Sequence, residues 1–149
     1  MSAYAQNKKA WLNYEILEEF EGGLMLKGFE VKAIKDNRAN LEGSYVIIRG
    51  GEAYLVGASI SPYQANNTPE NYDPAQARKI LVTKKELLRL QTNDAKKGLT
   101  LVPLSLYNKG NKVKLGFALA RGKKDYDKRE DMKKKEAKRD IERTLKYRK

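Results

Sequence analysis

The sequence predicts a mainly β fold: a small, closed or nearly closed barrel of about six strands with two to three helices, followed by a basic C-terminal tail. Two observations predict the barrel. Several short segments alternate apolar and polar residues, and glycine or asparagine turns separate them. A third observation, the lysine- and arginine-rich final stretch, predicts the tail. We divide the chain into a body at residues 1–120 and a tail at residues 121–149, with an open α+β sheet as the second choice for the body.

The first part of the chain is predicted to form a loose end, two strands and a short helix. Residues 1–6 show neither helix nor strand periodicity and are predicted to form a loose end. Residues 13–27 are interpreted as two strands, because apolar residues alternate before the Gly22-Gly23 pair, which is able to supply a turn. Residues 28–35 are compatible with a short helix on which Phe29, Ala33 and Ile34 are able to face a core.

The middle of the chain contains a hairpin and a long loop. Residues 44–58 read as SYVIIR, a Gly50-Gly51 turn and EAYLVGA, which predicts a β-hairpin. Residues 61–72 are polar and rich in proline and asparagine, which predicts a loop. Asp73 followed by Pro74 is typical of a helix start, with the aspartate as cap and the proline in the first turn.

The last part of the body predicts one more helix and one more hairpin. Thr83 followed three residues later by Glu86 forms a capping box ahead of the segment KKELLRL. Residues 99–107 and 112–120 are then two strands around a turn, and Pro103 requires a bulge or an edge in the first of them. Six strands with inserted helices favour an oligonucleotide-binding-like barrel.

The tail holds most of the net charge. Fourteen of its residues are lysine or arginine and seven are aspartate or glutamate, so it carries +7 of the net charge of +12. Most residues between Asp131 and Lys146 favour a helix, but the only apolar stripe is Ala137, Ile141 and Leu145. This stripe is too thin to bury against the body, so we predict a tail that is disordered when free and helical when bound.

The composition narrows the possible functions. The chain has no cysteine and no histidine, which removes disulfides, thiolate zinc sites and the commonest proton-transfer side chain. No phosphate-binding glycine loop is present, so we predict no enzyme, no metal and no cofactor. We find no membrane-spanning run or signal peptide and expect a soluble, cytoplasmic monomer. The basic charge fits nucleic acid or an anionic membrane surface, and the tail, poor in large apolar residues, favours nucleic acid.

Several ordered blocks resemble a known family, from Asn7 to the C-terminus. They are NKKA at 7–10, FEGGLMLKGFEVKAIK at 20–35, SYVIIRGGEAYLVGASISPY at 44–63, RKILVTKKEL at 78–87, GLTLVPLSLYNKG at 98–110 and GKKDYDKR at 122–129. In this combination the chain resembles the SmpB family of SsrA-binding proteins. The resemblance implies an oligonucleotide-binding-like barrel that holds the tRNA-like domain of transfer-messenger RNA (tmRNA, or SsrA RNA), and no catalysed reaction.

The resemblance also implies the partners and the setting, which is trans-translation on stalled ribosomes. The partners would be tmRNA, the 70S ribosome including its small-subunit rRNA, and elongation factor Tu in complex with alanylated tmRNA. The basic tail would enter the empty mRNA channel near the decoding centre and become helical there. The alternative is a generic RNA-binding protein of oligonucleotide-binding type, or a ribosome accessory protein, that uses the same barrel and tail.

The resemblance assigns an RNA-binding role to body residues that each have a structural alternative. The candidates are Asn7, Lys8, Glu21, Glu30, Lys32, Leu81 and Thr83. Asn7 would contact RNA or be solvated on a loose arm, and Leu81 would face a base or the core. Thr83 already has a capping role. The family usually has a basic pair where this chain has Trp11 and Leu12, and Trp11 would stack on RNA or pack under the barrel.

In the tail, the resemblance places a set of residues at the decoding centre, with a plain solvated charge run as the alternative. They are Gly122, Lys123, Lys124, Tyr126, Asp127, Lys128 and Arg129, with Leu145 as a later anchor of the helix.

Overall fold

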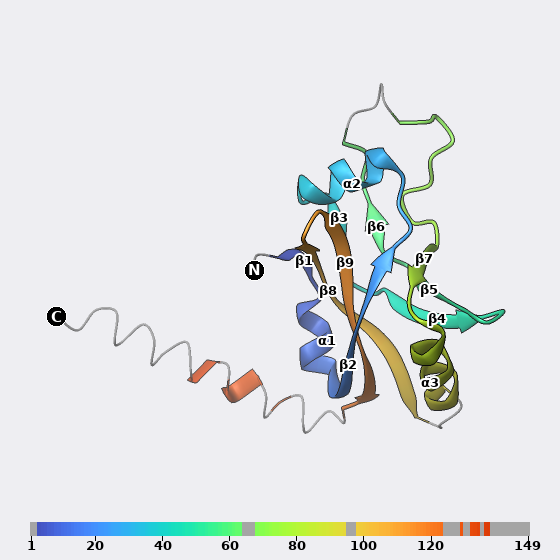
Figure 1. The fold of residues 1–149 in the computed structure, drawn as a ribbon. Coiled ribbons are helices and arrows are strands. Elements are labelled where there is room, and N and C mark those ends of the chain that lie inside the picture. The colour runs from blue at the N-terminus through green and yellow to red at the C-terminus, as the bar shows by residue number, and fades with distance from the viewer. Residues whose placement is uncertain are drawn as a thin grey trace.

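The computed structural model describes residues 3–63, 68–94 and 98–123, together with Arg129, residues 132–134 and residues 136–137 of the tail. Six strands form a closed ring in the order β8-β4-β5-β7-β2-β9, and β8 pairs with β9 to close it. The strands of the ring are β2 (Tyr14–Leu24), β4 (Tyr45–Arg49), β5 (Glu52–Val56), β7 (Arg78–Leu81), β8 (Leu99–Lys109) and β9 (Lys112–Gly122). The predicted barrel of about six strands is therefore confirmed (Figure 1).

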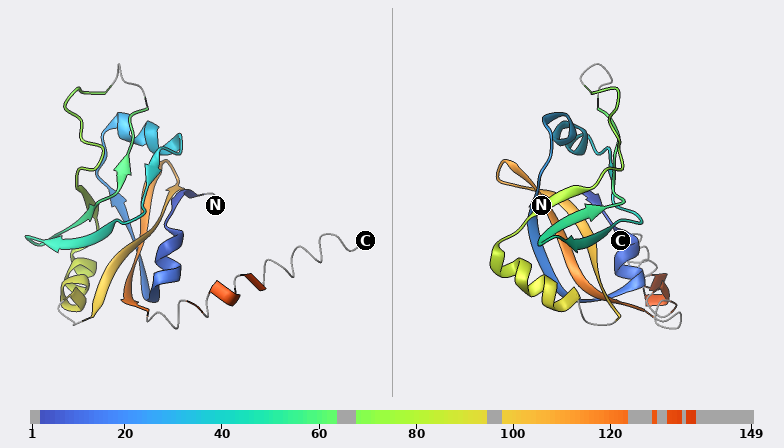
Figure 2. Two further views of the ribbon diagram at one scale, coloured as in Figure 1. Left: turned by 180° about the vertical axis from the view of Figure 1, so that it is seen from behind. Right: turned by 90° about the vertical axis from the view of Figure 1, so that its right-hand side faces the viewer.

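Short elements surround this ring. Strand β1 (Ala3–Gln6) pairs with β8, and β3 (Ala39–Asn40) pairs with β6 (Ser59–Ile60) in a separate two-stranded sheet. Helices α1 (Lys8–Asn13), α2 (Gly28–Lys35) and α3 (Lys84–Asp94) complete the body. Helices α2 and α3 lie at opposite ends of the barrel, and α1 lies along one side, as the two views of Figure 2 also show.

The barrel core follows the alternation of β9. Val113, Leu115, Phe117 and Leu119 point inward and are buried, and Phe117 stacks on Phe20 with ring centroids 5.6 Å apart. Burial of such side chains is the main driving force for closing the sheet. A second buried cluster lies on the outside of the sheet, where Ala10 of α1 packs against residues of β8 and β9 such as Val102 and Ala118. Helix α1 is thus attached to the outer face of the barrel.

The prediction of a loose N-terminal end is wrong. Residues 3–6 form β1, and Asn7 is 7% exposed. The Asn7 backbone N–H donates to the carbonyl of Leu104 at 2.8 Å, and its side-chain Nδ2 donates to the carbonyl of Pro103 at 2.9 Å. This strand could not be predicted from the sequence because it has only four residues. It is stabilised by pairing with the edge of β8 and shows no clear periodicity of its own.

The two strands predicted around Gly22-Gly23 are one continuous strand, β2. Gly22 and Gly23 lie opposite Leu115 and Lys114 of β9, and Gly23 also lies opposite Leu81 of β7. The two glycines do not form a turn. Gly22, which has no side chain, allows Ile80 of β7 to pack close to the backbone of β2. A Cβ placed on Gly22 would lie 2.6 Å from Cγ2 of Ile80, whereas one on Gly23 would find its nearest neighbour at 3.7 Å.

Substitution of these two glycines is expected to give unequal effects. Gly22→Ala should lower the free energy of unfolding by about 1–3 kcal/mol, because the new methyl group overpacks the contact with Ile80. Gly23→Ala is the matched control and should change it by less than about 1 kcal/mol, since an ordinary contact is available there. Urea denaturation of both variants measures the difference, and equal losses would contradict the packing argument.

Asp73-Pro74 does not begin a helix. Oδ1 of Asp73 accepts from the N–H of Ala75 at 2.9 Å, which closes a turn, and strand β7 begins at Arg78. The carbonyl of Pro74 accepts from the N–H of Ile60 at 3.0 Å and from Nη2 of Arg78 at 2.9 Å. Tertiary partners thus use the carbonyl that a helix would have required, so the local helix signal is overridden.

Four further predictions of local structure agree with the structure. Helix α2 matches residues 28–35, and the 44–58 hairpin turns at Gly50 and Gly51, which both have positive φ. The N–H of Glu86 donates to Oγ1 of Thr83 at 3.2 Å, so Thr83 caps α3 as predicted. The β8–β9 register shifts between Pro103 and Ser105, which is the expected bulge.

The paired sheet continues past residue 120. In β9, Arg121 and Gly122 still lie opposite Glu15 and Tyr14 of β2, and the N–H of Lys123 donates to the carbonyl of Asn13 at 2.8 Å. The described residues of the tail after Lys123 are helical and exposed. The disorder of the free tail and its ordering on a partner stay predictions.

Candidate nucleic-acid interface

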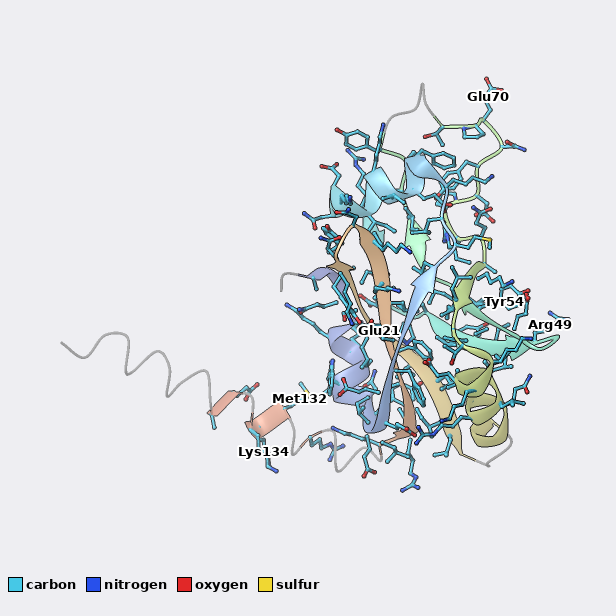
Figure 3. The ribbon with its side chains drawn as sticks, viewed as in Figure 1. Glu21, Arg49, Tyr54, Glu70, Met132 and Lys134 are labelled. Atoms are coloured by element: carbon cyan, nitrogen blue, oxygen red, sulfur yellow. The ribbon has the colours of Figure 1, made fainter. Side chains whose placement is uncertain are left out.

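A groove with a volume of about 500 Å³ lies on the outer face of the barrel between α1 and strands β2, β9 and β8. Figure 3 shows Glu21 on this face, on the strand that runs beside α1. The side chains that line the groove include Lys8, Trp11, Glu19, Glu21, Ser105 and Tyr107. Its size falls in the range of small-ligand sites, and it contains an aromatic wall, two carboxylates and a cation.

The floor of the groove depends on a glycine. Gly116 of β9 lies between Glu21 of β2 and Ser105 of β8. A Cβ at Gly116 would lie 3.3 Å from Oγ of Ser105 and 3.3 Å from Cε1 of Tyr107. Because position 116 has no side chain, the Tyr107 ring is able to lie close over β9 and reach the next strand.

Glu21 is held at both carboxylate oxygens. The hydroxyl of Tyr107 donates to Oε2, and Nζ of Lys109 donates to Oε1 at 2.9 Å. The hydrogen bond from Tyr107, and then that from Lys109, lowers the pKa of Glu21 below its usual value of 4.5. Burial, followed by the bond to Glu21, raises the pKa of Tyr107. Glu21 is therefore an ionised, oriented acceptor, and a carboxylate has further lone pairs for a ligand.

The groove continues toward β7 through a row of outer-face residues. Lys114 lies opposite both Gly23 and Tyr107, and Leu81 lies opposite Gly23. A Cβ at Gly23 would lie 3.7 Å from Nζ of Lys114 and 3.7 Å from Leu81, so these two side chains flank the bare backbone. Leu81 is 48% exposed, which places it on the surface and not in the core.

The structure brings together only part of the predicted RNA-binding set. Lys8 and Glu21 line the same groove, and Leu81 lies in the adjoining row. Thr83 is exposed, and its hydroxyl caps α3. Asn7 lies beneath this surface, where its side chain fastens the start of α1 to β8.

Glu30 and Lys32 belong to a different part of the molecule. Glu30 is 2% exposed, and its carboxylate pairs with Arg78, which is also buried, at 3.0 Å. Glu30 therefore has a structural role, the alternative that the sequence left open. Lys32 is exposed on α2, beside a separate groove that Tyr63 also lines.

Sequence reasoning missed Tyr107, Lys109 and Gly116. The available signal was Gly116 in the middle of a strand, which often marks a close approach of another group. The contact between Tyr107 and Glu21 joins residues 86 positions apart, so only the register of β8, β9 and β2 reveals it.

The structure describes only part of the predicted tail site. Gly122 ends β9, Nζ of Lys123 donates to the carbonyl of Trp11 at 3.3 Å, and Arg129 is helical and exposed. The tail therefore leaves the barrel beside α1. Lys124, Tyr126, Asp127, Lys128 and Leu145 lie outside the described residues.

The described residues contain no group of three or more acidic side chains able to hold a metal ion. None of their helices combines the length and the apolar character that a membrane span requires.

The fold and the groove define a small β-barrel protein with a polar and aromatic outer face and a basic tail. Comparison with known proteins gives the family. The SmpB protein family matches residues 4–147. The chain is 49% identical to the SsrA-binding protein of Carboxydothermus hydrogenoformans, over 97% of this chain and 96% of that protein. It is 46% identical to the SsrA-binding protein of Thermosynechococcus vestitus, over 97% and 95%.

A solved structure agrees with these relatives. A chain of "tmRNA-SmpB: a journey to the center of the bacterial ribosome" superposes with a TM-score of 0.66 and 43% identity, and the match covers 80% of this chain and 84% of that chain. The chain belongs to the SmpB family.

Proposed function

We propose that this protein binds tmRNA through the outer face of its barrel and acts with it on stalled ribosomes in trans-translation. The observation that carries the proposal is the match of the SmpB family to residues 4–147, nearly the whole chain. Relatives of similar length are named SsrA-binding proteins, and the solved relative is described with tmRNA and the ribosome.

The barrel is suited to hold a structured RNA by its shape. The groove and the Leu81–Lys114 row present an ionised carboxylate, an aromatic side chain and lysines across four neighbouring strands. RNA is recognised through such mixed contacts with splayed bases, 2′-hydroxyls and phosphates. In our proposal this face contacts the tRNA-like domain through Lys8, Glu21 and Leu81, with Thr83 at its border.

The tail performs the second part of the proposed function. It has an excess of seven positive charges and leaves the barrel at Lys123, beside α1. A cationic segment finds a phosphate-lined channel without reading its sequence. In our proposal the tail occupies the mRNA channel near the decoding centre only when no mRNA fills it. The protein works there as a monomer, in a complex with elongation factor Tu and alanylated tmRNA.

Competition between RNAs tests the RNA-binding half of this proposal. A fragment of tmRNA that contains the acceptor and D arms should bind at least about tenfold more tightly than poly(U), because shape recognition adds to the phosphate contacts. Equal affinities would favour the generic RNA-binding protein instead.

The same assay includes a matched pair of variants. Glu21→Gln should weaken binding of the fragment about five- to tenfold, since a charged acceptor is lost. Glu52→Gln is the control, because Glu52 also accepts from a tyrosine (Tyr54, 3.1 Å) and from a lysine (Lys79, 2.7 Å). Figure 3 shows Tyr54 on the barrel side away from Glu21. Equal losses in both variants would exclude a specific role for Glu21.

A further inference from the structure

The groove beside α1 combines carboxylate acceptors with an exposed aromatic ring, a surface that suits a base. Two carboxylates, Glu19 and Glu21, line it, and both side chains are exposed. A phosphate placed between them would be repelled. Trp11 also lines the groove and is 47% exposed, although an aromatic ring of that size is normally covered.

We propose that this groove takes one unstacked RNA base, which stacks on Trp11 and donates an N–H group of its edge to Glu21. The inference rests on the proposed function and adds to it a base-binding pocket. Every nucleobase has an aromatic face for Trp11, and amino and imino groups on base edges are donors that a carboxylate accepts. The volume of about 500 Å³ leaves room for a ring of that size.

Tyr107 is the positioning residue of this pocket. Its hydroxyl donates to Oε2 of Glu21 while Lys109 donates to Oε1, so the carboxylate is fixed before RNA arrives. A fixed acceptor loses less side-chain entropy on binding than a mobile one. Gly116 makes the arrangement possible, because a methyl group there would lie 3.3 Å from the Tyr107 ring.

Three lysines lie near the carboxylates, and in this proposal they contact the phosphates of the bound nucleotide. Lys8 of α1 lines the groove, Lys109 reaches Glu21 from the end of β8, and Lys114 follows on β9. In this proposal the base therefore contacts the aromatic ring and the carboxylate, and the phosphates contact the lysines. This division favours a single splayed nucleotide over a continuous duplex.

The chain offers a direct probe of the pocket, because Trp11 is its only tryptophan. Titration of the full chain with the tmRNA fragment should quench the tryptophan fluorescence in parallel with complex formation measured by filter binding. Trp11→Ala should weaken binding about tenfold, the loss expected for one stacked base. Tyr45→Ala is the matched control, because Tyr45 is 45% exposed and lines the groove on the other side of α1, and it should bind as the wild type does.

Tyr107→Phe tests the positioning role through its dependence on Glu21. It should weaken binding about threefold in the wild-type background and have no further effect in the Glu21→Gln background, because it acts through that carboxylate. Additive losses would overturn this role.

The outcomes separate this inference from the proposed function. Tight binding of the fragment with unchanged tryptophan fluorescence, or with full affinity in Trp11→Ala, would overturn the pocket and leave the function intact. Failure of the wild type to prefer the fragment over poly(U) would overturn the function itself. The fluorescence titration uses the unmodified chain, so a folding defect in a variant does not affect it.

Discussion

A chain that ends at Lys123 is expected to bind the tmRNA fragment within about threefold of the full protein and to fail completely in restarting stalled ribosomes. The cut keeps the whole barrel, because β9 ends at Gly122 and the N–H of Lys123 still reaches the carbonyl of Asn13. It removes twelve basic and seven acidic residues. The shortened chain therefore keeps the proposed RNA contacts of the barrel and loses the segment proposed to enter the mRNA channel.

Two measurements test whether the barrel binds the RNA and the tail acts on the ribosome. The salt dependence of binding to nonspecific RNA should be steeper for the full chain than for the shortened one, because fewer phosphates are neutralised after the cut. A full-length variant with glutamine at each lysine and arginine after Lys123 is the control for length, and it should also fail in rescue. Rescue at the normal rate by either variant, or loss of fragment binding by the shortened chain, would contradict the proposed roles.

Removal of the Glu30 carboxylate is expected to destabilise the fold more than the loss of any exposed carboxylate. Glu30 and Arg78 are each 2% exposed, and Nε of Arg78 donates to Oε2 of Glu30 at 3.0 Å. Arg78 also donates to the carbonyls of Ala58 and Pro74 and to the hydroxyl of Tyr72. Glu30→Ala leaves a buried guanidinium without its counter-ion, which typically costs about 3–5 kcal/mol of unfolding free energy.

Urea denaturation measures the loss of unfolding free energy in Glu30→Ala. Two control variants test whether the unpaired buried charge causes it. Glu42→Ala removes an exposed carboxylate paired with Lys9 and should change stability by less than about 1 kcal/mol. The double variant Glu30→Leu with Arg78→Met should recover part of the loss, because no charge stays buried. Recovery is incomplete, since the carbonyl of Ala58 loses its donor from Arg78 and the carbonyl of Pro74 keeps only the N–H of Ile60. A Glu30→Ala protein as stable as the wild type would show that this pair does not hold the segment before β7 against α2.

Local signals were sufficient for the regular parts of this fold. The glycine pair at 50–51 correctly predicted one hairpin, and the alternation from Val113 to Leu119 predicted the inner face of β9. Thr83 predicted the start of α3. In each case the residues that specify the element are neighbours along the chain. The resemblance to SmpB proteins could likewise be recognised from ordered blocks of sequence.

Elements that depend on distant partners could not be predicted in this way. The N-terminal residues become a strand only because β8 offers an edge, and the glycines at 22 and 23 continue a strand because β7 and β9 pass close to them. The helix signal at Asp73 failed for the same reason, because the carbonyl of Pro74 is used by Ile60 and Arg78. The secondary structure of these segments is determined by hydrogen bonds to residues far away in the sequence, which local sequence patterns do not predict.

The sequence by itself determined the barrel class, the basic tail, the family and the candidacy of Glu21 and Lys8. Only the tertiary structure decided what surrounds Glu21. It brought Tyr107 and Lys109 from β8 across Gly116, placed Trp11 beside them, and buried Glu30 with Arg78 away from the surface. The physical reason is that sheet register sets which side chains meet, and register is fixed by closure of the whole barrel and not by any one strand.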